Sequence, residues 1–269
     1  MVAGEGTMAS ARVWLAAVLC HISAKPIMRL WRLATQATWS MSPCADDPPY
    51  TYVEGPDPIR VLLLGGNAVA GFGVLTHELG LVGQIGRQLA HATGRGIEVE
   101  ACGRVGMTIN ELVSRVATLP RVRTGIVVIA LGINDILRMT SLRSWARDLN
   151  RLFDLVREDR AENVQIVVVK APSLHKNIVF AWLPQRIVVW QSQLLNEATR
   201  RICSRLDYVT LVPSPMTDDA HWPGMDGGSA DSYRRWASEL TIHMKHAALY
   251  LGHTQAQHDA RRQIKPEYQ

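Results

Sequence analysis

The chain has 269 residues, of which 47% are apolar, and a net charge of +5 from 29 basic and 24 acidic side chains. This apolar share excludes a wholly disordered chain. No uninterrupted apolar run reaches the length of about 18 residues that indicates a membrane-spanning helix. The basic residues are scattered along the sequence rather than gathered in one segment, so we expect no nucleic-acid partner.

The first 57 residues differ in character from the rest, and we expect them to form an apolar or amphipathic helical segment followed by a linker rich in Pro and Asp. An apolar stretch near the start fits the core of a signal peptide or an amphipathic helix. Further on, Arg29 and Arg32 stand among apolar residues at helical spacing. Such a helix either makes peripheral membrane contact, here through residues 12–40, or packs on the core or a partner. A cytoplasmic or membrane-associated location is favoured over secretion.

From residue 58 onward, short apolar strands alternate with amphipathic helices. The expected strands are 59–64, 96–101, 125–131, 164–169 and 208–212. The expected helices are 76–93, 109–119, 142–156, 185–206 and 229–251. This alternation predicts a doubly wound parallel α/β sheet in a domain covering residues 58–251, followed by a polar tail over 252–269.

The four cysteines do not suggest a metal site. They form no CxxC pair, and no histidine lies at zinc-finger spacing from them. We expect no metal and no organic cofactor. The cysteines are Cys20, Cys44, Cys102 and Cys203.

Three short motifs follow the first three expected strands, at the edge where ligands bind in such sheets. They are GGNAVAGFG at 65–73, VGMT at 105–108 and GIND at 132–135. The first is not a phosphate-binding loop, because Phe72 and Gly73 stand where Lys and Ser or Thr are required. The Asn and Asp of GIND either cap a helix or are costly to bury without partners.

Taken in order, these motifs resemble the first three blocks of the SGNH (GDSL-type) hydrolases, and residues 71–96 are similar to actinobacterial members. The resemblance implies a three-layer α/β/α sandwich with a five-stranded parallel sheet, of the flavodoxin-like type. Most members of the family are esterases, lipases and acyl or acetyl hydrolases. The resemblance therefore implies a small-molecule acyl ester, a lipid or a glycan as the ligand.

The first block departs from the family pattern at its most important position. Where the family has Gly-Asp-Ser, with the serine as nucleophile, this chain has Gly65, Gly66 and Asn67. An amide is not a substitute for a hydroxyl nucleophile. We expect the oxyanion hole implied by the resemblance to survive, because its donors are the backbone N–H groups of Asn67 and Gly106 and the side chain of Asn134.

Two alignments of the family's fourth block are possible, and they differ in whether a catalytic base is present. In the first, Asp218 and His221 match the family's Asp-x-x-His and form a base dyad. In the second, Asp226 and Gly227 match an Asp-Gly pair nearer the last helix, and Gly228 alone replaces the segment that holds the histidine.

Two hypotheses about function therefore stand. The preferred one is a hydrolase-like protein that is weakly active or inactive because Asn67 replaces the nucleophilic serine. Removing such a nucleophile costs on the order of a million-fold in rate. The alternative is an active acyl-ester hydrolase that uses a water molecule activated by His221 and Asp218, or another nucleophile.

Overall fold

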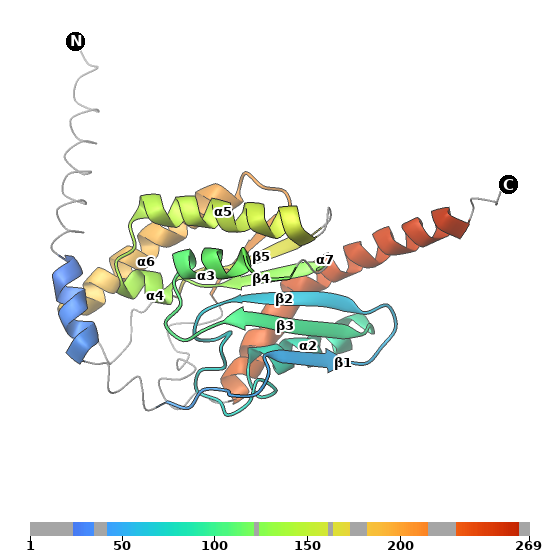
Figure 1. The fold of residues 1–269 in the computed structure, drawn as a ribbon, viewed down its shortest axis with the longest axis horizontal. Coiled ribbons are helices and arrows are strands. Elements are labelled where there is room, and N and C mark those ends of the chain that lie inside the picture. Colours follow the sequence, from blue (N-terminus) through green and yellow to red (C-terminus); the bar gives the residue numbers. More distant parts are fainter. Residues whose placement is uncertain are drawn as a thin grey trace, which may run out of the picture.

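The computed structural model describes residues 24–34, 42–120, 124–160, 164–172, 182–214 and 230–263. These residues build three layers, with helices on both faces of a twisted central sheet (Figure 1). The helices are α2 (Leu81–Thr93), α3 (Ile109–Val116), α4 (Ile133–Leu137), α5 (Leu142–Arg160), α6 (Trp182–Cys203) and α7 (Ala230–Gln263), with a further helix at 24–34.

The sheet has six strands in the order β1-β3-β2-β4-β5-β6, and not the five that we expected. Five strands run parallel, as predicted, and β1 pairs antiparallel with β3 at one edge. The expectation missed β1 because it is only four residues long and lies among Pro and Asp residues. The strands are β1 (Tyr50–Val53), β2 (Ile59–Gly65), β3 (Ile97–Gly103), β4 (Ile126–Ala130), β5 (Gln165–Val169) and β6 (Val209–Val212).

Side chains of the central strands alternate between two apolar cores, one on each face of the sheet. Leu62 and Leu64 of β2 belong to the core under α3, α5 and α6. Val61 and Leu63 belong to the core under α2 and α7. Strand β4 is buried on both faces in the same way, as its uninterrupted apolar sequence predicts.

The segment 42–57, which we expected to be a linker, is attached to the domain by more than β1. The N–H of Gly73 donates to the carbonyl of Pro43 at 2.7 Å. The carboxylate of Asp47 accepts the backbone N–H of His77 at 2.7 Å and lies 2.9 Å from its ring Nδ1. The polar residues that suggested a linker therefore provide partners for the loop after β2.

The chain's last helix also differs from expectation. Helix α7 continues to Gln263, whereas we expected a helix that ends near residue 251 and a polar tail. Its amino-terminal half is anchored on the sheet by Tyr233, Leu240 and Met244, all fully buried. The polar composition beyond residue 251 therefore does not end the helix, because a polar sequence can continue a helix that an earlier apolar face has anchored.

The amino-terminal helix, residues 24–34, packs on the core that includes α5 and α6. Its two buried side chains are Ala24 and Met28, while Leu30 and Leu33 are exposed. Of the two interpretations of this segment, packing on the core is thus observed for residues 24–34. Within the described residues, no helix combines the length and the apolar character needed to cross a bilayer.

Candidate functional site

Three of the five predicted site residues meet at the carboxyl edge of the sheet. Asn67 follows β2, Gly106 lies between β3 and α3, and Asn134 lies in the first turn of α4, directly after β4. Strand β2 pairs with both β3 and β4, so the segments that follow these strands are neighbours in space. The sheet order therefore brings together residues that are far apart in the sequence.

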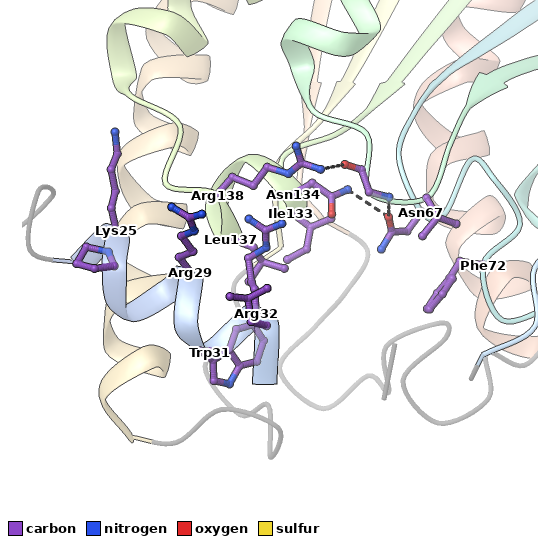
Figure 2. A pocket seen from close by; sticks show the side chains of 14 residues that line it. Lys25, Arg29, Trp31, Arg32, Asn67, Phe72, Ile133, Asn134, Leu137 and Arg138 are labelled. Atoms are coloured by element: carbon purple, nitrogen blue, oxygen red, sulfur yellow. Dashed lines mark hydrogen bonds between the residues drawn. The ribbon is translucent and has the colours of Figure 1, made fainter. Parts of the chain in front are cut away.

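The Asn67 side chain makes the central contacts of this site. Its amide oxygen Oδ1 accepts the backbone N–H of Gly106 at 2.9 Å and the side-chain Nδ2–H of Asn134 at 3.2 Å (Figure 2). The Asn67 side chain is buried, with 9% of the residue exposed. Two converging donors aimed at one oxygen are the arrangement that stabilises an oxyanion in acyl transfer. Here the oxygen that they hold belongs to the protein itself.

Backbone conformation fixes both donors. Gly106 has a φ of +79°, and Gly132, which begins α4 ahead of Asn134, has a φ of +118°. Both values lie in the region that favours glycine. A Cβ on Gly132 would also lie 2.5 Å from the Cβ of Ala171. A second hydrogen bond holds the Asn134 amide, since its Nδ2 also donates to the Met107 carbonyl at 3.1 Å.

A buried carboxylate supports the donors from behind. Asp135 accepts the backbone N–H of Ile109 at 3.1 Å and the hydroxyl of Thr140 at 2.9 Å, so it links the start of α3 to α4. Burial raises the pKa of Asp135 to about 6. The sequence indicated that this Asp needs partners, but it did not identify them. Asp135 is therefore a supporting residue of the site that our sequence analysis did not name.

The loop that carries Gly106 is further held by Arg138. Its Nη2 donates to the Gly106 carbonyl at 3.1 Å, and its Nη1 lies 3.5 Å from the carboxylate of Glu111. Glu111 in turn accepts the backbone N–H of Thr108 at 2.9 Å and caps α3. Hydrogen bonds to Thr108 and the nearby charges of Arg138 and Arg104 lower the pKa of Glu111 despite its partial burial.

A pocket of about 910 Å³ opens beside Asn67, between the carboxyl edge and the amino-terminal helix. That volume lies within the range of roughly 300–1,000 Å³ typical of small-molecule sites. Sequence analysis did not anticipate that the basic residues of this helix would lie next to the motif after β2. The pocket is lined by Lys25, Pro26, Arg29, Trp31, Arg32, Leu33, Asn67, Phe72, Val105, Gly106, Ile133, Asn134, Leu137 and Arg138.

The base dyad predicted at Asp218 and His221, and the alternative alignment that ends at Gly228, lie outside the described residues. Both remain predictions. Within the described part of the chain, no group of three His, Cys, Asp or Glu side chains is placed to hold a metal ion.

The sheet order and the two donors after β3 and β4 that converge on one oxygen are typical of the SGNH architecture. The sequence matches the GDSL-like lipase/acylhydrolase family over residues 63–249, and the chain belongs to that family. Among curated protein sequences none matches the chain significantly.

Solved structures of the same fold agree with this assignment. TesA shares 18% identity at a TM-score of 0.55, covering 70% of this chain and 99% of TesA. A carbohydrate acetylesterase family member from Sinorhizobium meliloti shares 20% identity at a TM-score of 0.53, with 70% and 98% covered. The esterase EstA from Pseudoalteromonas sp. shares 19% identity at a TM-score of 0.52, with 69% and 96% covered. At these identities the likeness concerns the fold.

Proposed function

We propose that this protein binds an acyl-ester, lipid or glycan ligand at the carboxyl edge of the sheet without serine-type hydrolysis. The observation that carries the proposal is the pair of hydrogen bonds that the Asn67 amide oxygen accepts from Gly106 and Asn134. The residue at the nucleophile position thus offers no hydroxyl, and it also fills the place of the substrate oxygen.

The two effects are independent and act in the same direction. An amide nitrogen is too weak a nucleophile to attack an ester carbonyl. A substrate carbonyl that enters the hole must also displace Oδ1 of Asn67 from two donors before it can be polarised. In acyl-transfer enzymes the loss of one such donor alone lowers kcat by about 10²–10³. The expected hydrolytic rate is therefore close to that of the uncatalysed reaction.

Binding does not require a nucleophile, and the pocket beside Asn67 remains in place. Its lining combines apolar side chains, among them Phe72, Ile133 and Leu137, with polar groups at one wall. Members of the family act on small-molecule esters, lipids or glycans, and this chain retains a cavity of suitable size for such molecules. The protein would thus bind the kind of molecule on which the family acts, without breaking an ester bond.

The test compares the protein with its Asn67→Ser and Asn67→Ala variants on p-nitrophenyl acetate and p-nitrophenyl butyrate. The Ala variant empties the hole but adds no nucleophile, so it is the matched control. We expect background rates for the protein and for Asn67→Ala, and measurable turnover only for Asn67→Ser. A fluorophosphonate probe, read by intact mass, should then label only Asn67→Ser.

Two results carry further information. Turnover by the unaltered protein that His221→Ala abolishes would contradict the proposal and favour a water molecule activated by the predicted dyad. If Asn67→Ser gains neither turnover nor label, the base is lost as well, which supports the alignment that ends at Gly228.

A further inference from the structure

The pocket beside Asn67 carries a concentration of positive charge that ester hydrolysis does not require. Four of its lining residues are cations: Lys25, Arg29 and Arg32 from the amino-terminal helix, and Arg138 from the end of α4. Among the described residues that line the pocket, none is Asp or Glu. Arg138 lies 3.5 Å from the carboxylate of Glu111. The same carboxylate is 3.3 Å from Arg104.

The cations of the amino-terminal helix and the cation at the end of α4 line the same pocket. Burial, and after it the positive charge of Arg138, lowers the pKa of Arg32. In Figure 2 the side chains of Arg29 and Arg32 extend from the helix toward Leu137 and Arg138. An anionic group placed among them would replace repulsion by charge-assisted hydrogen bonds.

Apolar side chains make up much of the remaining lining. Leu137 lies beside Arg29 and Arg32, Ile133 lies on the side toward Asn67, and Phe72 stands on the far side of Asn67 (Figure 2). A ligand whose charged end lies among the arginines would therefore place its remaining part on apolar side chains. Such a division of polar and apolar contacts selects an amphiphile over a free ion or an uncharged sugar.

We propose that this pocket binds an anionic amphiphile, an acyl or alkyl chain that ends in a phosphate or carboxylate group, with Arg29, Arg32 and Arg138 holding the anionic group. The inference rests on the proposed binding function of the site and names its ligand class. Arginine is suited to this task because its planar fork pairs with two oxygens of a phosphate or carboxylate.

The test measures binding by isothermal titration calorimetry with three probes below any critical micelle concentration: dodecyl phosphate, dodecyl maltoside and inorganic phosphate. The first two share a chain and differ in charge, and the third has the charge without the chain. We expect dodecyl phosphate to bind at least about 10-fold more tightly than either of the others, with an affinity that falls as NaCl is raised. Equal binding of dodecyl maltoside would overturn the role of charge. Equal binding of inorganic phosphate would overturn the role of the chain.

Substitutions locate the binding. Arg29→Gln combined with Arg32→Gln should weaken dodecyl phosphate binding about 10-fold or more, whereas Arg29→Lys combined with Arg32→Lys, which keeps the charge but loses the planar fork, should weaken it less. Arg205→Gln, an exposed arginine of the described surface outside the pocket lining, is the control and should change nothing. An unchanged affinity in the double Gln variant, with an unchanged circular dichroism spectrum, would overturn the proposal.

The result is separate from that of the hydrolysis test. Dodecyl phosphate contains no carboxylic ester, so its binding is read whether or not the protein hydrolyses p-nitrophenyl esters. If dodecyl phosphate does not bind selectively and esterase rates stay at background, the anionic-amphiphile proposal is wrong. The proposed loss of hydrolysis then still holds, with a different ligand. Esterase activity with retained dodecyl phosphate binding contradicts only the loss of hydrolysis.

Discussion

The two walls of the pocket are held in place by different means. The donor wall, with Gly106 and Asn134, is fixed by left-handed backbone conformations and by hydrogen bonds within the sheet domain. The facing wall is the amino-terminal helix, which two buried side chains, Ala24 and Met28, attach to the core. The donors therefore form as part of the sheet domain, whereas the helix is attached to the surface of that domain. The charge that the helix contributes to the pocket can therefore change without disturbing the donors.

The strongest way to break the donor wall is Gly132→Ala. The added Cβ meets both an unfavourable φ and the Cβ of Ala171, so we expect a loss of about 2–5 kcal/mol in the free energy of unfolding. Urea denaturation measures it. Gly94→Ala is the matched control, because Gly94 has a φ of +68° but nothing within 4 Å of an added Cβ. Equal losses in the two variants would contradict the role of close packing at α4.

A second test concerns the buried carboxyl behind the donors. Burial raises the pKa of Asp135 to about 6, from the ordinary value of 3.8. As pH rises from about 4 to about 6, the unfolded chain releases this proton before the native chain does. The contribution of Asp135 to the free energy of unfolding therefore falls by ~3 kcal/mol across that window and stays low above it.

Asp135→Asn removes this titration and keeps an acceptor for the N–H of Ile109. We expect the stability of the variant relative to the protein to increase by ~3 kcal/mol between pH 4 and pH 7, measured by urea denaturation. The same substitution at the exposed Asp154 on α5 is the control. A stability difference that does not change with pH would show that Asp135 titrates alike in both states.

Arg138→Gln should have a smaller effect. It removes the hydrogen bond to the Gly106 carbonyl from a side chain that is 39% exposed, so we expect a loss of about 1 kcal/mol and faster hydrogen exchange at the Gly106 amide. Arg104→Gln is the comparison, since that side chain contacts the same Glu111 and is 58% exposed. Its loss should stay below about 0.5 kcal/mol. An unchanged exchange rate at the Gly106 amide would show that Arg138 does not hold the Gly106 backbone in place.

Substitutions in the amino-terminal helix should change its local stability and leave the global stability almost unchanged. Met28 is 1% exposed, and Met28→Ala removes packing worth about 2–5 kcal/mol. The helix is expected to open locally, so the global free energy of unfolding changes by less than about 0.5 kcal/mol. Trypsin cleavage after Arg29 and Arg32 should become faster. Leu30→Ala, at a side chain that is 69% exposed, is the control. A full loss in the global value would show that the helix unfolds together with the domain.

The sequence predicted the parts of this molecule that depend on local pattern. Apolar strands such as β4 and the motifs after them fixed the parallel sheet and the placement of Asn67, Gly106 and Asn134 at one edge. Strand β1 was missed because an edge strand of four residues buries little and shows no clear alternation. Helix α7 was underestimated because its polar end carries no packing pattern.

The contacts of the site could not be predicted in the same way. Which donors the Asn67 oxygen accepts depends on a side-chain orientation set by three segments that meet only in the folded chain. The basic helix was recognised as amphipathic, but no local pattern in residues 24–34 indicates that it faces Asn67. Long-range pairing of this kind is a property of the tertiary structure, so the charged pocket became visible only there.

The position of Asn67, whose side-chain oxygen accepts hydrogen bonds from Gly106 and Asn134, has an evolutionary consequence. Each asparagine codon is one base away from a serine codon, and the groups around Asn67 have hydrogen bonds of their own besides those to its side chain. A point mutation in the gene can therefore exchange the side chain at this position while the surrounding scaffold stays assembled. Under the proposed function, this protein and a precursor of a hydrolase lie one nucleotide substitution apart.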